Sequence, residues 1–358
     1  MRTLIYCALL LILIGSLMAC DGGRTSGAAQ GERPHFLWEY KAGDYVRCAP
    51  AVAEGSVYIG TDDNRLYALD ADTGAERWRH ETGDNITSRP VPVEGRVAIG
   101  SWDGLVRMLS AIDGSSRWRY ATGGWISAPL AAAADLILAA SEDGALYALS
   151  VADGSLRWRF RTGGAILGAP TVADAVVYVG SVDNYLYALA LDDGSLRWRT
   201  RLGGDVVSAP LVQKGAILVG ASDRRVYAFD AATGQPRWRR DVGSAVDAGL
   251  VTDGQRIYGA TNAGRVFSLR LADGQSLWQI NVSGPVRAQP LVWRASLIVA
   301  DAEGTLHGLE ARTGRELWRY PLGSPIIGGL ALVEDRLYGG TIDGFVYALQ
   351  LDAGTTFP

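Results

Sequence analysis

Eight tryptophans recur at a constant spacing of 40 residues, and no other feature of the chain constrains its fold as strongly. They are Trp38, Trp78, Trp118, Trp158, Trp198, Trp238, Trp278 and Trp318. A period of this length is typical of repeat architectures, in which each unit buries its apolar face only against its neighbours. We therefore expect a single repeat domain that spans nearly the whole chain.

One repeat, residues 163–202, shows what each unit contains. It holds four short runs rich in β-branched and aromatic residues, and turn residues separate them. Pairs such as Asp183-Asn184 suit the positive φ of a tight hairpin turn. No run keeps a helical period. The pattern predicts an all-β chain in which each unit is a four-stranded antiparallel sheet.

A glycine recurs at one position of all eight repeats, and in seven of them a tryptophan follows it four residues later, which indicates a shared backbone requirement. It recurs at Gly74, Gly114, Gly154, Gly194, Gly234, Gly274, Gly314 and Gly354. Such a position needs a positive φ or a close approach of another group. We expect the eight tryptophans to be structural docking residues that pack toward the next unit.

The two ends of the repeat array indicate a closed ring. The eighth unit reaches Pro358 without a fourth strand, and the segment that begins at Trp38 parallels the one that begins at Trp318. A first strand that completes the last sheet removes the open edge. We therefore predict that residues 36–358 form an eight-bladed β-propeller whose last blade is closed by the N-terminal strand, near residues 36–41.

The N-terminal residues predict export and a membrane anchor. Residues 1–19 contain an early Arg2 and a short apolar run, as in a signal peptide. The run ends before Cys20 in a sequence similar to a bacterial lipobox, so we expect Cys20 to carry lipid and residues 20–35 to be a flexible tether. Asp21 resembles an inner-membrane retention signal, which leaves the choice of membrane open.

Charge and residue composition limit the partners, disulfides and metal sites that can be expected. The net charge of −4 does not suggest a nucleic-acid partner. Cys48 is the only cysteine expected in the mature chain outside the lipidation site, so no internal disulfide is expected. His35, His80 and His307 have no metal-ligand spacing, and we expect no metal site. His307 stands where other repeats have Tyr or Phe, which predicts a packing role.

Arginines flank the tryptophan in many repeats, as in Arg157-Trp158-Arg159. Alternation along a strand places the tryptophan on one face and both arginines on the other. Charges on an outer strand discourage aggregation between sheet edges. A basic surface that binds an anionic partner is the alternative interpretation.

The turn-and-tryptophan segments resemble a known repeat. Residues 68–78 (ALDADTGAERW) and 228–238 (AFDAATGQPRW) are similar to the tryptophan-docking motif of pyrroloquinoline-quinone-like propellers. The resemblance covers about residues 36–354. It implies a propeller fold, and it leads to two branches of the family with different functions.

Quinoprotein dehydrogenases form one branch, and the resemblance implies for them adjacent cysteines, a quinone and a calcium ion over the propeller axis. This chain lacks the cysteine pair and the long inserted loops. The other branch contains the BamB-type outer-membrane protein assembly factors, which are lipoproteins with an eight-bladed propeller that act as scaffolds. The layout of this chain resembles that branch, which favours the outer membrane.

The most variable positions near the axis are the candidate binding residues. One β-branched residue per repeat, from Val46 to Ile326, is expected on the first strand and between blades. Its neighbours are expected on the other face, around the mouth of the central channel. These candidates are Tyr45, Arg47, Asn85, Thr87, Arg89, Trp125, Asp205, Asp247 and Arg287. A water-filled channel without a ligand is the alternative. Trp102, in a hairpin, is a second candidate for protein contact.

These observations favour a non-catalytic interaction scaffold of the bacterial cell envelope, lipid-anchored, monomeric and facing the periplasm, without a cofactor. Its expected partners are envelope proteins, and assistance to a β-barrel assembly complex is the most specific version. A propeller that binds a small molecule or glycan is the alternative, and a quinone-dependent dehydrogenase is a third hypothesis. The sequence contains no G-x-S-x-G elbow and no phosphate-binding P-loop.

Overall fold

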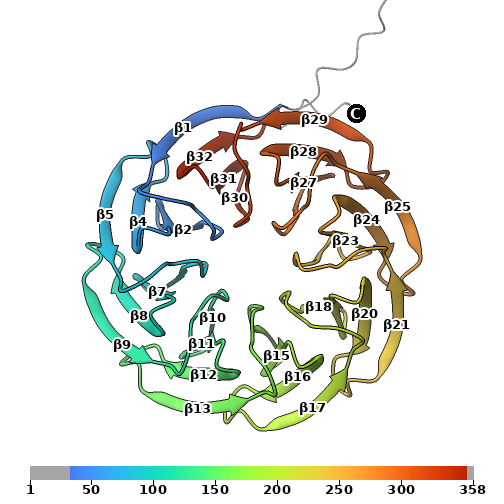
Figure 1. Ribbon diagram of the computed structural model, residues 1–358, viewed down its shortest axis with the longest axis horizontal. Coiled ribbons are helices and arrows are strands. Elements are labelled where there is room, and N and C mark those ends of the chain that lie inside the picture. Colours follow the sequence, from blue (N-terminus) through green and yellow to red (C-terminus); the bar gives the residue numbers. More distant parts are fainter. Residues whose placement is uncertain (1–32, 353–358) are drawn as a thin grey trace, which may run out of the picture. The chain divides into compact units, whose positions relative to one another are not determined.

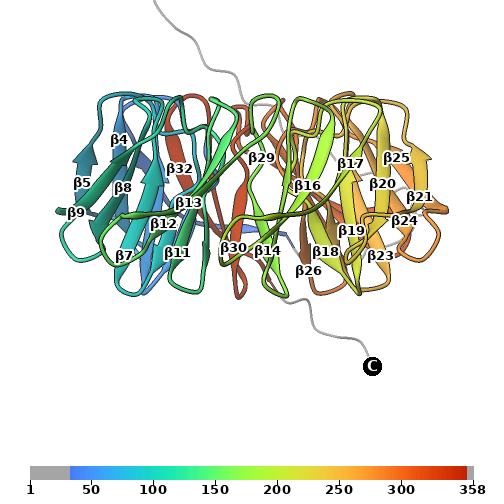
Figure 2. The same cartoon turned by 90° about the horizontal axis from the view of Figure 1, so that it is seen from below.

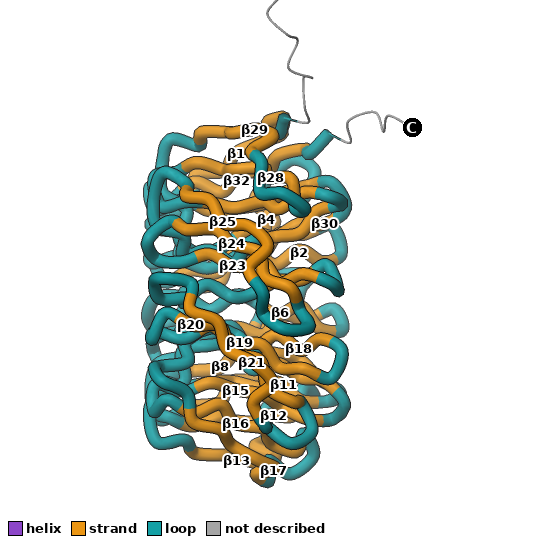
Figure 3. The backbone as a smooth tube through the Cα atoms, turned by 90° about the vertical axis from the view of Figure 1, so that its right-hand side faces the viewer, coloured by secondary structure: helices purple, strands orange, loops and turns teal. Residues whose placement is uncertain are grey.

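A computed structural model describes residues 33–352 as a ring of eight four-stranded antiparallel sheets around a central axis (Figure 1). This arrangement confirms the predicted all-β, eight-bladed propeller. Seen from the side, the strands run between two faces of the ring, and the turns lie at both faces (Figures 2 and 3). The described residues contain no helix long and apolar enough to cross a membrane. The predicted signal peptide and Cys20 lie outside the described residues, as does most of the predicted tether.

Within each of the first seven blades, four consecutive strands run outward from the axis in sequence order. The strands of blades 1 to 4 are β2 Ala51–Ala53, β3 Ser56–Gly60, β4 Arg65–Asp70 and β5 Glu76–Glu81; β6 Val91–Val93, β7 Arg96–Gly100, β8 Leu105–Ser110 and β9 Ser116–Ala121; β10 Ala131–Ala133, β11 Leu136–Ala140, β12 Ala145–Ser150 and β13 Leu156–Arg161; β14 Thr171–Ala173, β15 Val176–Gly180, β16 Tyr185–Ala190 and β17 Leu196–Arg201. Those of blades 5 to 7 are β18 Leu211–Gln213, β19 Ala216–Gly220, β20 Arg225–Asp230 and β21 Pro236–Asp241; β22 Val251–Thr252, β23 Arg256–Ala260, β24 Arg265–Arg270 and β25 Ser276–Asn281; β26 Leu291–Trp293, β27 Ser296–Ala300, β28 Thr305–Glu310 and β29 Glu316–Pro321.

The eighth blade joins the two ends of the domain. It contains β30 Leu330–Val333, β31 Arg336–Gly340 and β32 Phe345–Gln350, and its outer strand is β1 His35–Lys41. β1 pairs antiparallel with β32, from His35 opposite Gln350 to Lys41 opposite Phe345. This pairing confirms the predicted closure by the N-terminal strand, and it leaves no blade without its fourth strand.

The recurring tryptophans join each blade to the next one. In the described part of the chain, seven of the eight indole Nε1 groups donate a hydrogen bond to a backbone carbonyl 33 residues later, at 2.9–3.1 Å. For Trp78 the acceptor is the Ala111 carbonyl, in the turn between the third and fourth strands of blade 2. The prediction that the tryptophans pack toward the next unit is therefore confirmed.

The recurring glycines lie directly beneath these indoles. Gly114 has φ +69°, and a Cβ at this position would lie 2.5 Å from Cε3 of Trp78. The same relationship joins Trp38 to Gly74 and Trp158 to Gly194. Both reasons predicted for the glycine, a positive φ and a close approach, apply at once.

The apolar core is divided among the interfaces between adjacent blades. One such cluster joins Tyr58, Leu66 and Trp78 of blade 1 to Val97 and Ile99 of blade 2, all of which are buried. Both faces of the middle strands are therefore buried, and for this reason their sequences are nearly continuous apolar runs. A rigid ring of this kind holds the segments near the axis in fixed positions.

Candidate binding site at the central channel

Eight connecting segments carry the chain from the outer strand of one blade to the innermost strand of the next. Each contains one fully buried β-branched residue, from Val46 through Ile326. Ile86, for example, packs on Gly60 of the preceding blade, where an added Cβ would lie 2.3 Å from its Cγ2. The packing predicted between blades is therefore observed.

The prediction that these β-branched residues lie on the first strand of each blade is wrong. Val46 lies in an irregular segment, and the innermost strand of blade 1 begins only at Ala51. The Ile86 backbone N–H donates to the Thr61 carbonyl in a turn of the preceding blade at 3.2 Å. The segment crosses between two blades, so its hydrogen bonds go to turns and not to a neighbouring strand.

The nine candidate residues divide into two groups. Those that line a cavity of about 700 Å³ on the axis are Arg47, Thr87, Arg89, Asp247 and Arg287. The other four lie outside its lining and form part of a rim on the same face of the ring: Tyr45, Asn85, Trp125 and Asp205. Tyr45 is 46% exposed and Trp125 is 50% exposed. The structure thus brings five candidates together and places four farther from the axis.

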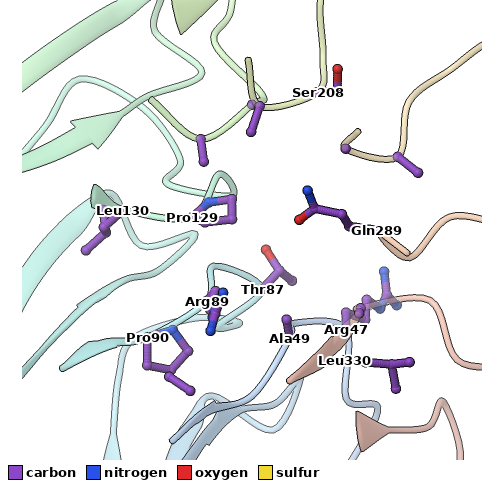
Figure 4. Close-up of a pocket in the computed structure, with 18 of the residues that line it drawn as sticks. Arg47, Ala49, Thr87, Arg89, Pro90, Pro129, Leu130, Ser208, Gln289 and Leu330 are labelled. Atoms are coloured by element: carbon purple, nitrogen blue, oxygen red, sulfur yellow. The ribbon is translucent and has the colours of Figure 1, made fainter. Parts of the chain in front are cut away.

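Each blade contributes one residue to the cavity lining at an equivalent position of the repeat. Six of the eight residues are small or a proline, and the other two are Arg89 and Gln289: Ala49, Arg89, Pro129, Ala169, Ala209, Gly249, Gln289 and Gly329. Arg89 and Gln289 line the cavity from different sides, near Thr87 (Figure 4), and the Gln289 amide donates to the Leu250 carbonyl of the preceding blade at 2.9 Å. Sequence reasoning missed Gln289, although a comparison of equivalent repeat positions would have singled it out.

Two charged residues of the cavity lining have polar partners within their own blades. Arg47 Nε lies 2.7 Å from Asp62 Oδ2, and the Asp62 side chain is only 7% exposed. Burial raises the pKa of Asp62, and the Arg47 guanidinium opposes this shift. Asp247 accepts a hydrogen bond from the amide of Asn262. In both blades the partner stands 15 residues after the lining residue.

Arg89 and Arg287 differ from Arg47. Within residues 33–352, neither forms an ion pair or a side-chain hydrogen bond with another residue. The Arg89 side chain keeps access to the channel water while the channel walls surround it, and this desolvation lowers the pKa of its guanidinium. The cavity therefore contains two arginines that can accept an anionic group.

An aromatic pair connects the cavity to the rim. Trp102 donates from Nε1 to Thr87 Oγ1 at 2.8 Å. Its ring stacks on Trp125, with ring centroids 4.9 Å apart and an interplanar angle of 5°. Trp102 is itself partly exposed, as expected from its hairpin position. We call Trp102 and Trp125 the rim tryptophan pair.

The described residues do not fit a calcium–quinone centre. The cavity lining offers one carboxylate, Asp247, among three arginines, whereas Ca²⁺ takes six to eight oxygen ligands. No group of three or more His, Cys, Asp or Glu in residues 33–352 is placed to hold a metal ion. Cys48 is buried against Gly60, and burial raises the pKa of its thiol to about 12.

Solved structures with the same architecture show the range of proteins that share it. BamB from Moraxella catarrhalis has a TM-score of 0.80 at 20% identity, covering 89% of this chain and 100% of that one. The computationally designed Ika8 protein has a TM-score of 0.78 at 20% identity, covering 88% and 99%. Quinohemoprotein alcohol dehydrogenase from Comamonas testosteroni has a TM-score of 0.76 at 14% identity, covering 93% and 79%. At these identities the likeness shows the fold alone.

Sequence comparison identifies the family. No curated protein matches the chain at a significant level. The family model described as outer membrane protein assembly factor BamB matches residues 28–124, 102–195, 176–296 and 286–356, which together cover the propeller. The chain therefore belongs to the family of the outer membrane protein assembly factor BamB.

Proposed function

We propose that the protein is a non-catalytic interaction scaffold of the bacterial cell envelope, and that it assists the assembly of β-barrel proteins at the outer membrane. Family membership supports an envelope role. In this proposal Cys20 carries the lipid anchor, residues 20–35 form the tether, and the propeller faces the periplasm. The partners are envelope proteins, foremost a β-barrel assembly complex.

The rim tryptophan pair is the observation that carries this proposal. Trp125 is half exposed, yet its ring is held by stacking on Trp102, which Thr87 fixes in turn through a hydrogen bond. Rigid, exposed aromatic side chains supply a large contact area at a low entropic cost, and they are enriched among the residues that dominate protein interfaces. Tyr45, whose ring lies 5.5 Å from the Arg47 guanidinium, extends the same face.

Site-specific crosslinking in the native membrane tests this proposal. A photoreactive residue replaces Trp125, and in a control it replaces Ile112, which is 87% exposed. Ile112 lies in the turn before β9 and Trp125 in the segment after it, so the two positions lie at opposite ends of that strand and hence on opposite faces of the ring. We expect adducts with a barrel-assembly component from position 125 only. Recovery of no such component from position 125 would contradict the assembly role.

The cavity supports a second candidate function, the binding of a small anionic molecule or glycan. Arg89 stands in a ring of mostly small side chains and has no partner among the described residues, so a ligand carboxylate or phosphate can reach it. Thermal-shift measurements with sugars, peptidoglycan fragments and small anions test this function. A shift in the wild type that Arg89→Ala abolishes would favour it over the scaffold.

A quinone-dependent dehydrogenase remains the third hypothesis, because the propeller architecture also occurs in a quinohemoprotein dehydrogenase. The cavity lining argues against it, since it supplies a single carboxylate. Calcium-dependent quinone binding together with dye reduction would be required to support it.

A further inference from the structure

The outer strands of the propeller divide into a basic half and a neutral half. β9 contains two arginines, and β13, β17 and β21 contain three each, whereas Asp241 is the only acidic residue on these four strands. The other four outer strands, β25, β29, β1 and β5, carry equal numbers of acidic residues and of lysines or arginines. Each group is continuous around the ring.

The arginines of the basic half are exposed and most of them form no ion pair, although Arg161 and Arg240 donate to backbone carbonyls. All of them are exposed, and within residues 33–352 only Arg157 and Arg237 form ion pairs, with Asp135 at 3.5 Å and Asp230 at 2.8 Å. In the neutral half, the arginines of β5 and β29 are all paired; Arg79 lies near Glu76, and Arg319 lies 2.8 Å from Glu316. We call the exposed arginines of β9, β13, β17 and β21 the arginine belt.

The belt is a concentrated positive surface on a chain with a net charge of −4. Arginines two residues apart on a strand lie about 7 Å from each other. Like charges at this spacing repel one another, and the local positive potential attracts anions. Guanidinium groups pair with phosphate and carboxylate groups through two parallel hydrogen bonds.

The shape of the belt restricts its partner. It follows blades 2 to 5, which form the lower half of the ring in Figure 1. A flat surface such as a bilayer touches a convex edge along one or two blades, so it cannot engage all four strands. A flexible linear chain can follow the curve and contact every strand.

The backbone of these strands does not favour the addition of a peptide strand. Each outer strand has a register shift against its inner neighbour, as between Ala148 and Leu149 of β12 where β13 pairs. Bulges and charged side chains at a sheet edge both hinder pairing with a further strand. Recognition through the arginine side chains is therefore favoured over recognition through the strand backbone.

We infer that the arginine belt binds a flexible linear polyanion that carries phosphate or carboxylate groups. The belt lies across the ring from β1, where the described chain enters the propeller (Figure 1). This inference does not depend on the rim tryptophan pair or on the central cavity.

Binding of the full chain, purified in detergent, to long-chain polyphosphate and to polygalacturonate tests the inference and distinguishes the two anionic groups. The belt variant combines Arg119→Gln, Arg159→Gln, Arg199→Gln and Arg239→Gln. The matched control combines Arg79→Gln, Arg312→Gln, Arg319→Gln and Arg336→Gln, which remove the same charge from exposed, ion-paired positions outside the belt. Circular dichroism and thermal melting confirm that both variants are folded.

We expect the belt variant to lose at least 10-fold in affinity for one or both polymers at low salt, and the control to change by less than 3-fold. The slope of log K against log salt should fall by about 3 in the belt variant, since each neutralised charge contributes about 0.7. Inorganic phosphate should bind too weakly to detect, because it engages a single strand. Equal losses in both variants, or no binding of either polymer by the wild type, would overturn the inference. So would a larger belt-dependent loss of binding to phosphatidylglycerol vesicles than to either polymer, because the belt would then recognise a membrane surface.

Discussion

The indole of Trp78 lies on Gly114 of the next blade, and its Nε1 donates to the Ala111 carbonyl in the same turn at 2.9 Å. One side chain therefore fixes both the distance and the angle between two adjacent sheets. The same contact recurs at seven places around the ring in the described residues, so the orientation of adjacent blades there depends on a glycine that leaves room for the indole.

Replacing Gly114 with alanine tests this contact. The added Cβ would meet Trp78 at 2.5 Å, and the backbone would keep a φ of +69°. We expect a loss of about 3 kcal/mol in unfolding free energy, from the left-handed backbone and the displaced indole together. Urea unfolding followed by tryptophan fluorescence measures this loss.

Gly95→Ala is the matched control for that variant. Gly95 has a nearly identical φ of +68°, but no atom lies within 4 Å of the added Cβ. We expect a loss of only about 1 kcal/mol, the backbone contribution alone. Equal losses at the two positions would show that the indole does not need the glycine.

Much of the fold could be predicted because its determinants repeat. The spacing of Trp78 and Gly114 recurs in every unit, and seven copies make the same contact between blades in the described residues. The closure by β1 followed from a comparison of the two chain ends. The irregular segment around Val46 was mistaken for a strand because it is β-branched and alternating. Its hydrogen bonds to a turn of the preceding blade have no sequence pattern of their own.

The candidate site could be predicted only in part. Repeat positions identify which residues are equivalent, but they do not give the distance of each position from the axis. Arg47 and Tyr45 are two residues apart, yet only Arg47 lines the cavity. The sequence also does not show that Arg47 forms an ion pair whereas Arg89 and Arg287 do not, since this depends on whether a carboxylate lies across the blade from each arginine.

His307 shows a further difference between sequence and structure. The substitution of His for Tyr or Phe predicted a packing role, and the side chain is indeed fully buried. Its Nε2 lies 3.0 Å from Asp301 Oδ2, and its Nδ1 lies 2.7 Å from Glu316 Oε1. Asp301 is also fully buried, and the imidazole is the only polar partner of its Oδ2 among the described residues.

We expect His307→Phe to destabilise the domain by about 3–5 kcal/mol, because it leaves Asp301 as a buried carboxylate without its partner. The double variant Asp301→Thr/His307→Phe restores the pair found in blade 6, Thr261 and Phe267, which are both buried. It should recover more than half of the lost unfolding free energy in urea titrations. A double variant as unstable as the single one would contradict the pairing.

Acid sensitivity follows from the turns between the third and fourth strands. The hydroxyl and N–H of Ser115 hold the pKa of Asp113 to about 2, and the N–H and hydroxyl of Ser155 do the same for Asp153. The unfolded value is about 3.9. Because the folded pKa is the lower one, the stabilisation is present above pH 4 and is lost as the pH falls toward 2.

The paired variant Ser115→Ala/Ser155→Ala measures that effect. Without the hydroxyls the folded pKa values move toward the unfolded value, so the melting temperature should decrease less steeply between pH 4 and pH 2 than in the wild type. Melting curves at half-unit steps of pH from 5 to 2 give the two slopes. Parallel slopes would show that these turns do not contribute to acid unfolding.

Closure of the ring depends on β1, because it is the only strand of blade 8 that comes from the other end of the domain. Deleting residues 21–41 removes β1 and the Trp38 indole, and it exposes the edge of β32. We expect this variant to unfold or to oligomerise, since an unpaired strand edge is a template for pairing between chains. Light scattering and circular dichroism distinguish the two results. Deleting residues 21–32 is the control, because it keeps β1 and should leave the melting temperature unchanged. If the longer deletion stayed monomeric with an unchanged melting temperature, the strand exchange in blade 8 would not be what closes the ring.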